Sequence, residues 1–146
     1  MELTRDFKEF IKSLNDHKVK YLLVGGYAVA AYGYPRYTGD IDFWVERSLD
    51  NSKRLLEALK DFGFGSMNMT ANDFIKQDAV IQLGFPPNRI DILTGLSGLS
   101  FDECWDDKKE IVIAAEKLYV ISLHHLKINK KKTNRDRDRD DLKNLP

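Results

Sequence analysis

The chain has 146 residues, of which 42% are hydrophobic and 32% are charged, as in a globular domain of ordinary composition. Lysine plus arginine and aspartate plus glutamate each number 23, which excludes an overall basic field that would hold a nucleic acid by charge alone. The single cysteine excludes an internal disulfide, and no apolar run approaches the roughly 20 residues of a membrane span. The first six residues are charged and show no secretion signal. We therefore expect a cytoplasmic protein.

The first third of the chain predicts two helices and two strands. Thr4 can cap a helix over residues 4–16, in which apolar side chains recur at helical spacing. Residues 19–24 form a short, partly β-branched apolar run that predicts a buried strand, which ends at a pair of glycines. A helix over residues 27–32 follows, and residues 41–45 predict the next strand.

Helices and strands continue to alternate after residue 50. A helix is expected over residues 52–62, and a β-hairpin over residues 80–85 and 89–93. A second strand pair is expected over residues 111–113 and 119–121, and a capped helical region from residue 122 onward. Asp50 and Ser122 are the expected caps of the two helices, and a tail of alternating charge covers 135–145. No repeat and no long linker divides the chain, so residues 1–146 are expected to form a single α/β domain.

The turn Gly25-Gly26, between a predicted strand and a predicted helix, is the first feature that indicates chemistry. Paired glycines let a phosphate come close to the backbone, and the start of the helix that follows presents free N–H groups. Many strand-to-helix turns contain glycine for packing reasons alone. This turn by itself therefore leaves both interpretations open.

Asp40-Ile41-Asp42 places two carboxylates at alternate positions of a predicted strand, so both point to the same face, roughly 6–7 Å apart. Two such charges repel each other, and at 4 Å with an effective dielectric constant near 20 the cost is about 4 kcal/mol. Solvent on an open strand face relieves that repulsion, and so does a divalent cation such as Mg²⁺. The apolar run Phe43-Trp44-Val45 indicates a covered strand and so favours the cation.

Asp91 lies inside a second apolar run, Arg89-Ile90-Asp91-Ile92-Leu93. A carboxylate among β-branched apolar residues is costly unless it has a partner. Arg89, two residues away on the same face, is one candidate partner. A metal ion shared with Asp40 and Asp42 is the other, and the sequence leaves both open.

Taken together, these motifs resemble the nucleotidyltransferase superfamily of the DNA polymerase β type. The motifs of that superfamily are a Gly-Gly or Gly-Ser turn before a short helix, an Asp-x-Asp pair on the next strand, and a third acidic residue on a later strand. The matching segments are Leu23-Val24-Gly25-Gly26, Asp40-Ile41-Asp42-Phe43 and Arg89-Ile90-Asp91-Ile92. The resemblance implies a nucleotidyltransferase fold, in which a mixed central sheet is flanked by helices.

Within the superfamily, the chain resembles the small bacterial, toxin-like AbiEii group. Proteins of that group carry an arginine and a hydroxyl residue before the aspartate pair, matched by Arg36-x-Thr38-x-Asp40-x-Asp42. They often end with a lysine on a helix, followed by Arg-x-Lys-Asp-x-x-Asp-Leu. Lys130 and residues 135–142 match that ending, except that Arg137 replaces the usual lysine and the run is more charged.

The resemblance implies a metal centre made of Asp40, Asp42 and Asp91. These residues would hold one or two Mg²⁺ ions, with Mn²⁺ as a substitute. Asp40 and Asp42 would bind the ion that bridges the NTP phosphates. Asp91 would complete the second site and act as a general base toward the acceptor hydroxyl.

The resemblance also implies a set of nucleotide-binding residues. Gly25, Gly26 and Thr38 would cradle the β and γ phosphates, and Arg36 and Lys130 would neutralise charge on the leaving pyrophosphate. Each has a simpler alternative. The arginine can be a solvated loop residue, the threonine can close a turn, and the lysine run around Lys130 can be a solvated helix face.

The function this predicts is Mg²⁺-dependent transfer of a nucleotide from an NTP, ATP first, to a hydroxyl of a protein, a tRNA or a small molecule. The AbiEii resemblance adds a role in a toxin–antitoxin pair. The alternative is a non-catalytic module of the same fold that binds a partner protein, as an antitoxin would. Little chain remains for an acceptor-binding domain, so a partner protein or a second copy is expected to recognise the acceptor. A nucleic-acid partner stays open, because only the C-terminal lysines offer a basic patch.

Packing or surface roles are expected for the remaining polar and aromatic candidates. His124 and His125 lie beside the apolar Leu126, and we assign them no metal. The tyrosines near the glycine turn are expected to pack, although one of them could stack on a base. The Arg/Asp alternation over 135–141 is expected to form local ion pairs worth about a few tenths of a kcal/mol each.

Overall fold

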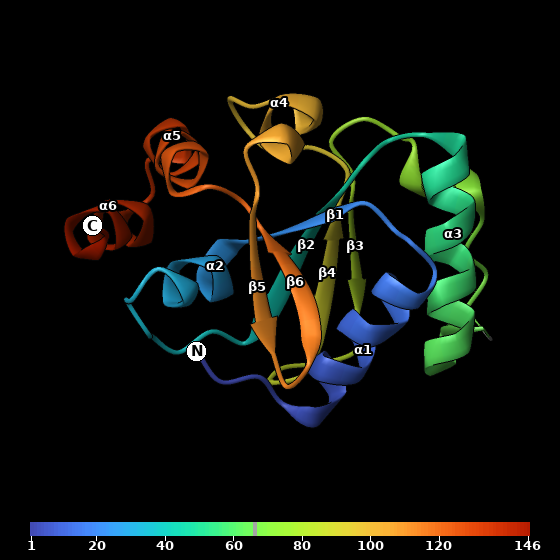
Figure 1. Ribbon diagram of the computed structural model, residues 1–146. Helices are drawn as coiled ribbons and strands as arrows, with labels where there is room; N and C mark the ends of the chain where they lie inside the picture. Colours follow the sequence, from blue (N-terminus) through green and yellow to red (C-terminus); the bar gives the residue numbers. More distant parts are fainter. Residues whose placement is uncertain (66) are drawn as a thin grey trace.

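One mixed β-sheet forms the centre of the molecule (Figure 1). In the computed structural model, which describes residues 1–65 and 67–146, six strands pair in the order β3-β4-β2-β1-β6-β5. In chain order the strands are β1 (Tyr21–Val24), β2 (Asp40–Val45), β3 (Val80–Leu83), β4 (Arg89–Leu93), β5 (Lys109–Ile113) and β6 (Glu116–Val120). Each predicted strand is present, and the hairpin β5–β6 is longer than its predicted runs.

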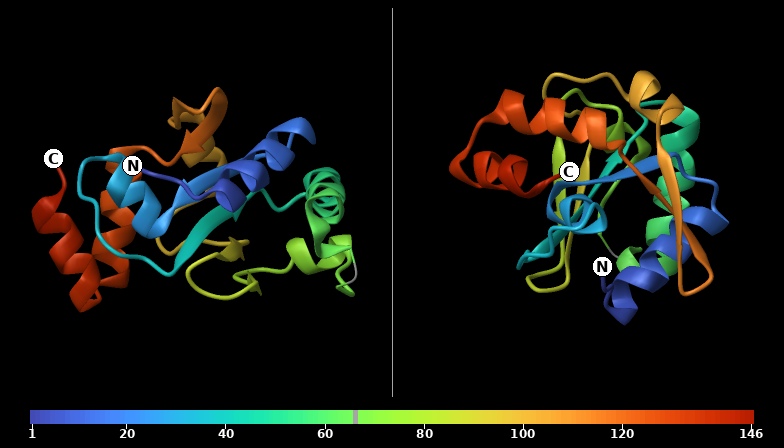
Figure 2. Two further views of the ribbon diagram at one scale, coloured as in Figure 1. Left: turned by 90° about the horizontal axis from the view of Figure 1, so that it is seen from below. Right: turned by 60° about the vertical axis from the view of Figure 1, so that its left-hand side comes forward.

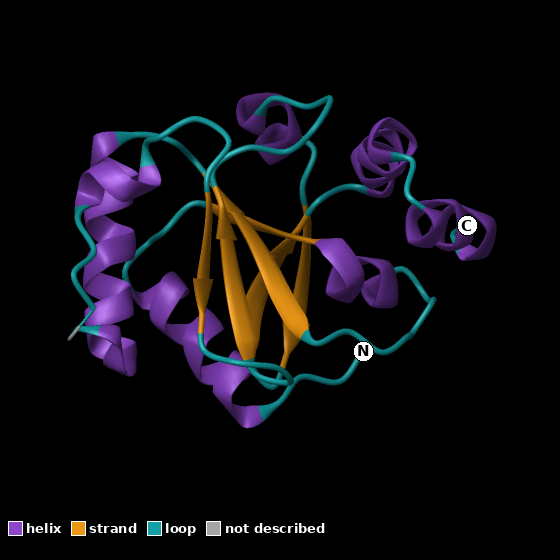
Figure 3. Ribbon diagram, turned by 180° about the vertical axis from the view of Figure 1, so that it is seen from behind, coloured by secondary structure: helices purple, strands orange, loops and turns teal. Residues whose placement is uncertain are grey.

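Helices lie on both faces of this sheet (Figures 2 and 3). Helices α1 and α3 lie against one face, and α2, α5 and α6 lie on the other side. The helices are α1 (Arg5–Asp16), α2 (Gly25–Ala31), α3 (Leu49–Leu59), the π-helical turn η1 (Lys60–Phe64), the 3₁₀ turn η2 (Ala71–Phe74), α4 (Phe101–Asp106), α5 (Leu123–Thr133) and α6 (Asp136–Asn144). Across the described residues, no helix is both long enough and apolar enough to cross a membrane. The prediction of a mixed sheet flanked by helices is confirmed.

The pairing of β2 with its neighbours puts the acidic residues side by side. β2 runs parallel to β4, with Asp42 opposite Asp91 and Asp40 opposite Arg89, and it runs antiparallel to β1. Because alternate residues of a strand point to the same face, all four of these side chains project from one face of the sheet. The fold therefore creates one polar face and leaves the other face to the core.

The apolar face of the sheet is covered by α1 and α3 (Figure 1). Helix α1 begins next to the predicted cap, because Thr4 Oγ1 accepts a hydrogen bond from the backbone N–H of Phe7. Its apolar stripe is buried, and Phe10 packs against Phe43 of β2 and against Phe62, with ring centroids 5.4 and 5.1 Å away. Packing of Phe43 on this side directs its neighbours on β2 to the polar face.

Helix α3 begins earlier than the sequence predicts. Its N-cap is Ser48 rather than Asp50, because Ser48 Oγ accepts a hydrogen bond from the backbone N–H of Asn51 at 3.1 Å. The buried Asn51 side chain ties this end to the sheet, since it accepts from the Lys20 N–H and donates to the Lys20 and Glu46 carbonyls. At the other end the chain continues into η1 instead of stopping.

Two short elements, η2 and α4, do not appear in the sequence prediction. Neither is long enough to show a periodic apolar pattern. In α4, Phe101 packs edge-on against Trp44 of β2 with centroids 5.2 Å apart. The lone thiol, Cys104, is buried in the same helix, and burial raises its pKa to about 11. Phe101 and Cys104 therefore both contribute to core packing.

Replacing Phe10 with alanine tests the core that orients β2. Phe10 is fully buried between two aromatic rings, so Phe10→Ala is expected to lower the free energy of unfolding by about 3–5 kcal/mol. Phe85→Ala is the matched control, because Phe85 is 84% exposed, and its effect should stay within about 0.5 kcal/mol. Urea denaturation of both variants measures the difference, and equal losses would contradict this packing.

Candidate active site

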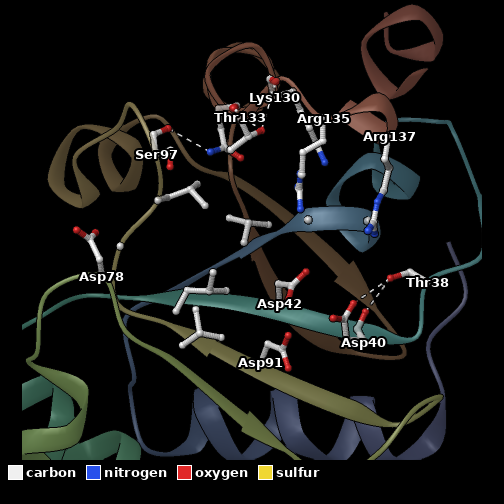
Figure 4. Close-up of a pocket in the computed structure, with 18 of the residues that line it drawn as sticks. Thr38, Asp40, Asp42, Asp78, Asp91, Ser97, Lys130, Thr133, Arg135 and Arg137 are labelled. Atoms are coloured by element: carbon white, nitrogen blue, oxygen red, sulfur yellow. Dashed lines mark hydrogen bonds between the residues drawn. The ribbon is translucent and has the colours of Figure 1, made fainter. Parts of the chain in front are cut away.

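Three carboxylates from two strands meet on the polar face of the sheet (Figure 4). One oxygen each of Asp40, Asp42 and Asp91 lies within 4.8 Å of the other two. Asp42 and Asp91 are direct neighbours across the parallel pair β2–β4, and Asp40 lies two residues before Asp42. The structure thus brings together the three acidic residues that the sequence proposed as one centre.

The three aspartates stand in a partly dehydrated place. Asp91 is 5% exposed, and Asp42 is half-buried. Burial, together with the negative charges of Asp40 and Asp91, raises the pKa of Asp42 to about 7. Burial also raises the pKa of Asp91, against the opposing hydrogen bond from Arg89. The site is therefore short of positive charge.

Arg89 is the one cation that reaches the carboxylates within the described residues. Its Nε lies 3.0 Å from Asp91 Oδ1, and its Nη2 lies 3.1 Å from Asp91 Oδ2 and 2.5 Å from Asp40 Oδ2. The ion pair that the sequence left open for Asp91 is present, and it extends to Asp40. It coexists with the clustering of the three carboxylates.

The glycine turn lies directly against Asp42. Gly25 has φ +68°, and a Cβ built there would collide with Asp42 Oδ2. A Cβ on Gly26 would come within 3.1 Å of the Arg36 and Thr38 side chains. Thr38 Oγ1 in turn donates to the backbone carbonyl and to Oδ1 of Asp40, at 3.1 and 3.2 Å. Glycine is needed here because the backbone and the carboxylates are in contact.

A pocket of about 700 Å³ opens over this face, between the sheet and the α5–α6 segment. Its polar lining residues are Asp40, Asp42, Arg89 and Asp91 from the sheet, Arg36 and Thr38 from the α2–β2 loop, Asp78 from the segment before β3, Ser97 from the β4–α4 loop, and Asn129, Lys130, Thr133, Arg135 and Arg137 from the C-terminal segment. Each residue that the sequence proposed for metal or nucleotide binding lines this one pocket.

Arg36 and Lys130 are engaged in a buried ion cluster rather than facing solvent. Arg36 Nε and Nη2 lie 2.7 and 2.9 Å from the two carboxylate oxygens of Asp141. Lys130 Nζ lies 3.0 Å from Asp141 and 3.2 Å from Asp138. Both aspartates are fully buried, and Arg135 adds a second cation to Asp138 at 2.8 Å. This cluster fastens α6 to α5 and to the α2–β2 loop.

The charged tail forms local ion pairs as predicted, Arg135 with Asp138 and Arg139 with Asp136, but Asp138 and Asp141 are buried and also pair with distant residues. Burial works to raise the pKa of Asp138, but hydrogen bonds from Arg135, Thr133 and Lys130 hold it well below the ordinary value. The pKa of Asp141 is also lowered, because the hydrogen bonds from Arg36 and Lys130 outweigh its burial. Which charged residues of the tail are buried depends on where α6 packs, and the sequence alone does not show this.

Arg135 and Arg137 are pocket residues for which the sequence predicted local ion pairs and no role in substrate binding. In Figure 4 both side chains extend from the C-terminal segment into the pocket. Arg137 is exposed and forms no ion pair within the described part of the chain, unlike Arg135. The available signal was that Arg137 stands where the resembling proteins carry a lysine. Asp78, at the far end of the pocket, had no signal in the sequence.

One of the two histidines is packed and the other is exposed, in line with the packing or surface roles expected for them. His125 is 6% exposed, and its Nδ1 lies 3.0 Å from Ser122 Oγ at the start of α5. His124 is exposed on the same helix. Neither lines the pocket over the carboxylates.

A mixed sheet with a glycine turn against an Asp-x-Asp strand, and a third carboxylate on the parallel neighbour, defines the class of protein: the fold is that of the nucleotidyltransferases. The chain belongs to the family described as "Nucleotidyl transferase of unknown function (DUF2204)", whose model matches residues 3–146. The resemblance to the nucleotidyltransferase superfamily is thereby confirmed, whereas the narrower AbiEii-like grouping stays a prediction.

The fold is also similar to the crystal structure of a Thermotoga maritima protein proposed to be a nucleotidyltransferase. The TM-score is 0.65 at 16% sequence identity, over 96% of this chain and 89% of that one. At this level of identity the likeness shows a shared fold. No curated protein matches the chain by sequence.

Removing Asp141 tests the buried ion cluster. Asp141→Asn leaves Arg36 and Lys130 without their shared carboxylate, and we expect the free energy of unfolding at neutral pH to fall by about 3–5 kcal/mol. The control is Asp136→Asn on the same helix, where the side chain is 98% exposed and the loss should stay within about 0.5 kcal/mol. Urea denaturation of both variants checks this.

The difference in unfolding free energy between wild type and Asp141→Asn is expected to depend on pH. Because folding lowers the pKa of Asp141, its stabilisation is present above the ordinary carboxyl pKa of about 3.9 and is lost as the pH falls through the lower, folded value. The gap between wild type and Asp141→Asn should therefore narrow on acidification. A gap that widens would contradict the assignment.

Proposed function

We propose that this chain is an active, Mg²⁺-dependent nucleotidyltransferase that transfers an NMP group from an NTP, ATP first, to the hydroxyl of an acceptor. The observation that carries this proposal is the meeting of Asp40, Asp42 and Asp91 on adjacent parallel strands beside the Gly25 turn. Membership of a nucleotidyl transferase family supports the reaction type.

The donor set suits a hard divalent cation. Carboxylate oxygens are the ligands that Mg²⁺ and Mn²⁺ prefer, and magnesium is usually held by one or two carboxylates plus substrate phosphates. Asp42 is half-buried and makes no ion pair with any residue that the structure describes, so no neighbouring cation occupies its oxygens. A metal bound there would polarise the α-phosphate and stabilise the attacking and leaving oxygens.

Asp91 is proposed as the general base. The acceptor oxygen would bond to the α-phosphorus, the bond from that phosphorus to the oxygen bridging to the β-phosphate would break, and pyrophosphate would leave. The hydroxyl proton would pass to Asp91, whose buried carboxylate has a raised pKa and so a greater affinity for it. The attacking oxygen and the leaving oxygen would then lie on opposite sides of the α-phosphorus.

The phosphate end of the substrate is proposed to lie between the glycine turn and the start of α6. Gly25, Gly26 and Thr38 stay the proposed cradle, because a backbone without side chains leaves room beside Asp42. Arg36 and Lys130 stay proposed contributors of charge, although each is already paired. The cluster holds three cations, Arg36, Lys130 and Arg135, against two carboxylates, Asp138 and Asp141, and so carries one surplus positive charge.

We add Arg137 as the residue best placed to meet a phosphate directly. It lines the pocket, is exposed, and has no ion-pair partner in the described part of the chain. A guanidinium binds phosphate through two parallel N–H donors. It is therefore proposed to bind the β and γ phosphates.

The acceptor and the biological setting are proposed from the resemblance alone. A protein, a tRNA or a small molecule can each offer a hydroxyl, and a partner protein or a second copy is proposed to present it. A toxin–antitoxin role and a cytoplasmic location belong to the same proposal. The alternative, a module that binds a partner protein without catalysis, requires neither nucleotide nor metal at the aspartates.

Labelling with nucleotides tests the reaction. We expect the protein to transfer label from an α-labelled NTP to a component of a cell lysate in the presence of Mg²⁺, and each NTP is tried in turn. Asp91→Asn should reduce the rate by about 10²–10⁴-fold, as loss of a general base does. Asp42→Asn should abolish Mg-ATP binding in isothermal titration while circular dichroism shows an intact fold.

The matched control is Asp78→Asn, a carboxylate of the same pocket that lies outside the proposed metal centre. It should keep Mg-ATP binding. Titrations in which wild type and Asp42→Asn behave alike would contradict the enzyme and favour the binding module.

Two arginines of one helix test the phosphate contact. Arg137→Met should raise the KM for the NTP by about tenfold to a hundredfold, the loss expected for a hydrogen bond to a charged group. Arg139→Met is the control, because Arg139 pairs with Asp136 and lies outside the pocket. Steady-state kinetics of the two variants gives the comparison. A KM unchanged by Arg137→Met would remove this residue from the site.

A further inference from the structure

Arg89 occupies the space between two of the three carboxylates. Its Nη2 lies 2.5 Å from Asp40 Oδ2 and 3.1 Å from Asp91 Oδ2, so one nitrogen bridges both residues. Its Nε adds a second bond to Asp91 at 3.0 Å. A cation that bridged Asp40 and Asp91 would compete with Arg89, which already contacts Oδ2 of Asp40 and both carboxylate oxygens of Asp91.

The strand register keeps Arg89 in this place. It is the first residue of β4, opposite Asp40 on β2 and two residues before Asp91, so all three side chains share one face. When all three carboxylates are ionised they carry three negative charges, and Arg89 cancels one of them. Asp42 is left without an ion pair among the described residues. The residues of this centre therefore neutralise its negative charge only in part, at Asp40 and Asp91 and not at Asp42.

We propose, on the basis of the metal site proposed above, that Arg89 is an internal counter-cation. In the metal-free protein it holds Asp40 and Asp91 together and takes the place of a metal ion that would bridge them. A first metal ion can bind at Asp42 without disturbing it. An ion that uses both Asp40 and Asp91 must displace the guanidinium, so Arg89 sets the affinity of the centre for metal.

The position of Arg89 allows it to leave without a change in the fold. Its side chain is 28% exposed, and it follows the exposed turn 84–88 that joins β3 to β4. Displacement is proposed to occur by rotation about its side-chain bonds, which would move the guanidinium from the carboxylates toward the solvent-exposed side of the pocket. There it would stay close to the charges of a bound triphosphate.

Metal titration without nucleotide tests this inference. Mn²⁺ serves as the probe, and the signal of free aqueous Mn²⁺ in electron paramagnetic resonance reports binding. Arg89→Met removes the competing cation, so we expect its Kd for Mn²⁺ to fall by about tenfold or more relative to wild type. Mn²⁺ should also raise the Tm of this variant more than that of wild type, because its carboxylates repel each other until metal binds.

Two control variants separate competition from a general charge effect. Arg89→Lys keeps the positive charge at the same position and should bind Mn²⁺ much as wild type does. Arg137→Met removes one positive charge from the same pocket without touching Asp40 or Asp91, and should tighten binding less than Arg89→Met. Should Arg89→Met not fold, Arg89→Gln replaces it in the same titration.

Binding of Mn²⁺ by the neutral Arg89 variant that is equal to or weaker than wild type would overturn the inference, since Arg89 would then only order the carboxylates. The outcome is independent of the transfer reaction. Tighter Mn²⁺ binding without nucleotide transfer would overturn the proposed function and leave the counter-cation in place. Nucleotide transfer by the wild type, together with unchanged Mn²⁺ binding in the Arg89 variant, would support the proposed function and overturn the counter-cation.

Discussion

Repulsion among three carboxylates is the constraint on which the rest of this structure depends. Backbone pairing of the adjacent strands fixes the Cα positions of Asp40, Asp42 and Asp91, so these residues stay neighbours as long as the sheet is intact. Two neighbouring features of the structure bear on this repulsion. Arg89 neutralises part of the charge, and the glycine turn leaves the space beside Asp42 unfilled by side chains. A sheet that held these charges without such neighbours would be less stable.

A second group of buried charges gives the pocket its far wall. Asp138 and Asp141 stand on one face of α6 and pair with cations from α5 and from the loop before β2. Buried ion pairs of this kind add little net stability, but they fix which groups lie together. The result is a wall with a small excess of positive charge opposite a floor with an excess of negative charge. Such a pair of surfaces suits a ligand that carries both phosphates and metal.

The sequence predicts the acidic floor of the pocket better than the opposite wall, and the reason is physical. Side chains at alternate positions of a strand share a face whatever surrounds them, so the pairing of Asp40 with Asp42 follows from local geometry. In the tail, arginine and aspartate alternate, and every charge has a local partner available. Only the packing of α6 decides that Asp138 and Asp141 are buried while Arg137 is left exposed. The start of α3 has the same origin: Ser48 and Asp50 can both cap a helix, and the contacts of Asn51 with the sheet decide between them.

The bond between Arg36 and Asp141 joins positions that are 105 residues apart. During synthesis the strands that carry the three aspartates leave the ribosome well before α6 does. A nascent chain can thus complete its acidic floor while the opposite wall is still missing. The wall opposite the aspartates is therefore complete only after residues 138–141 of α6 have emerged, later than every strand of the sheet.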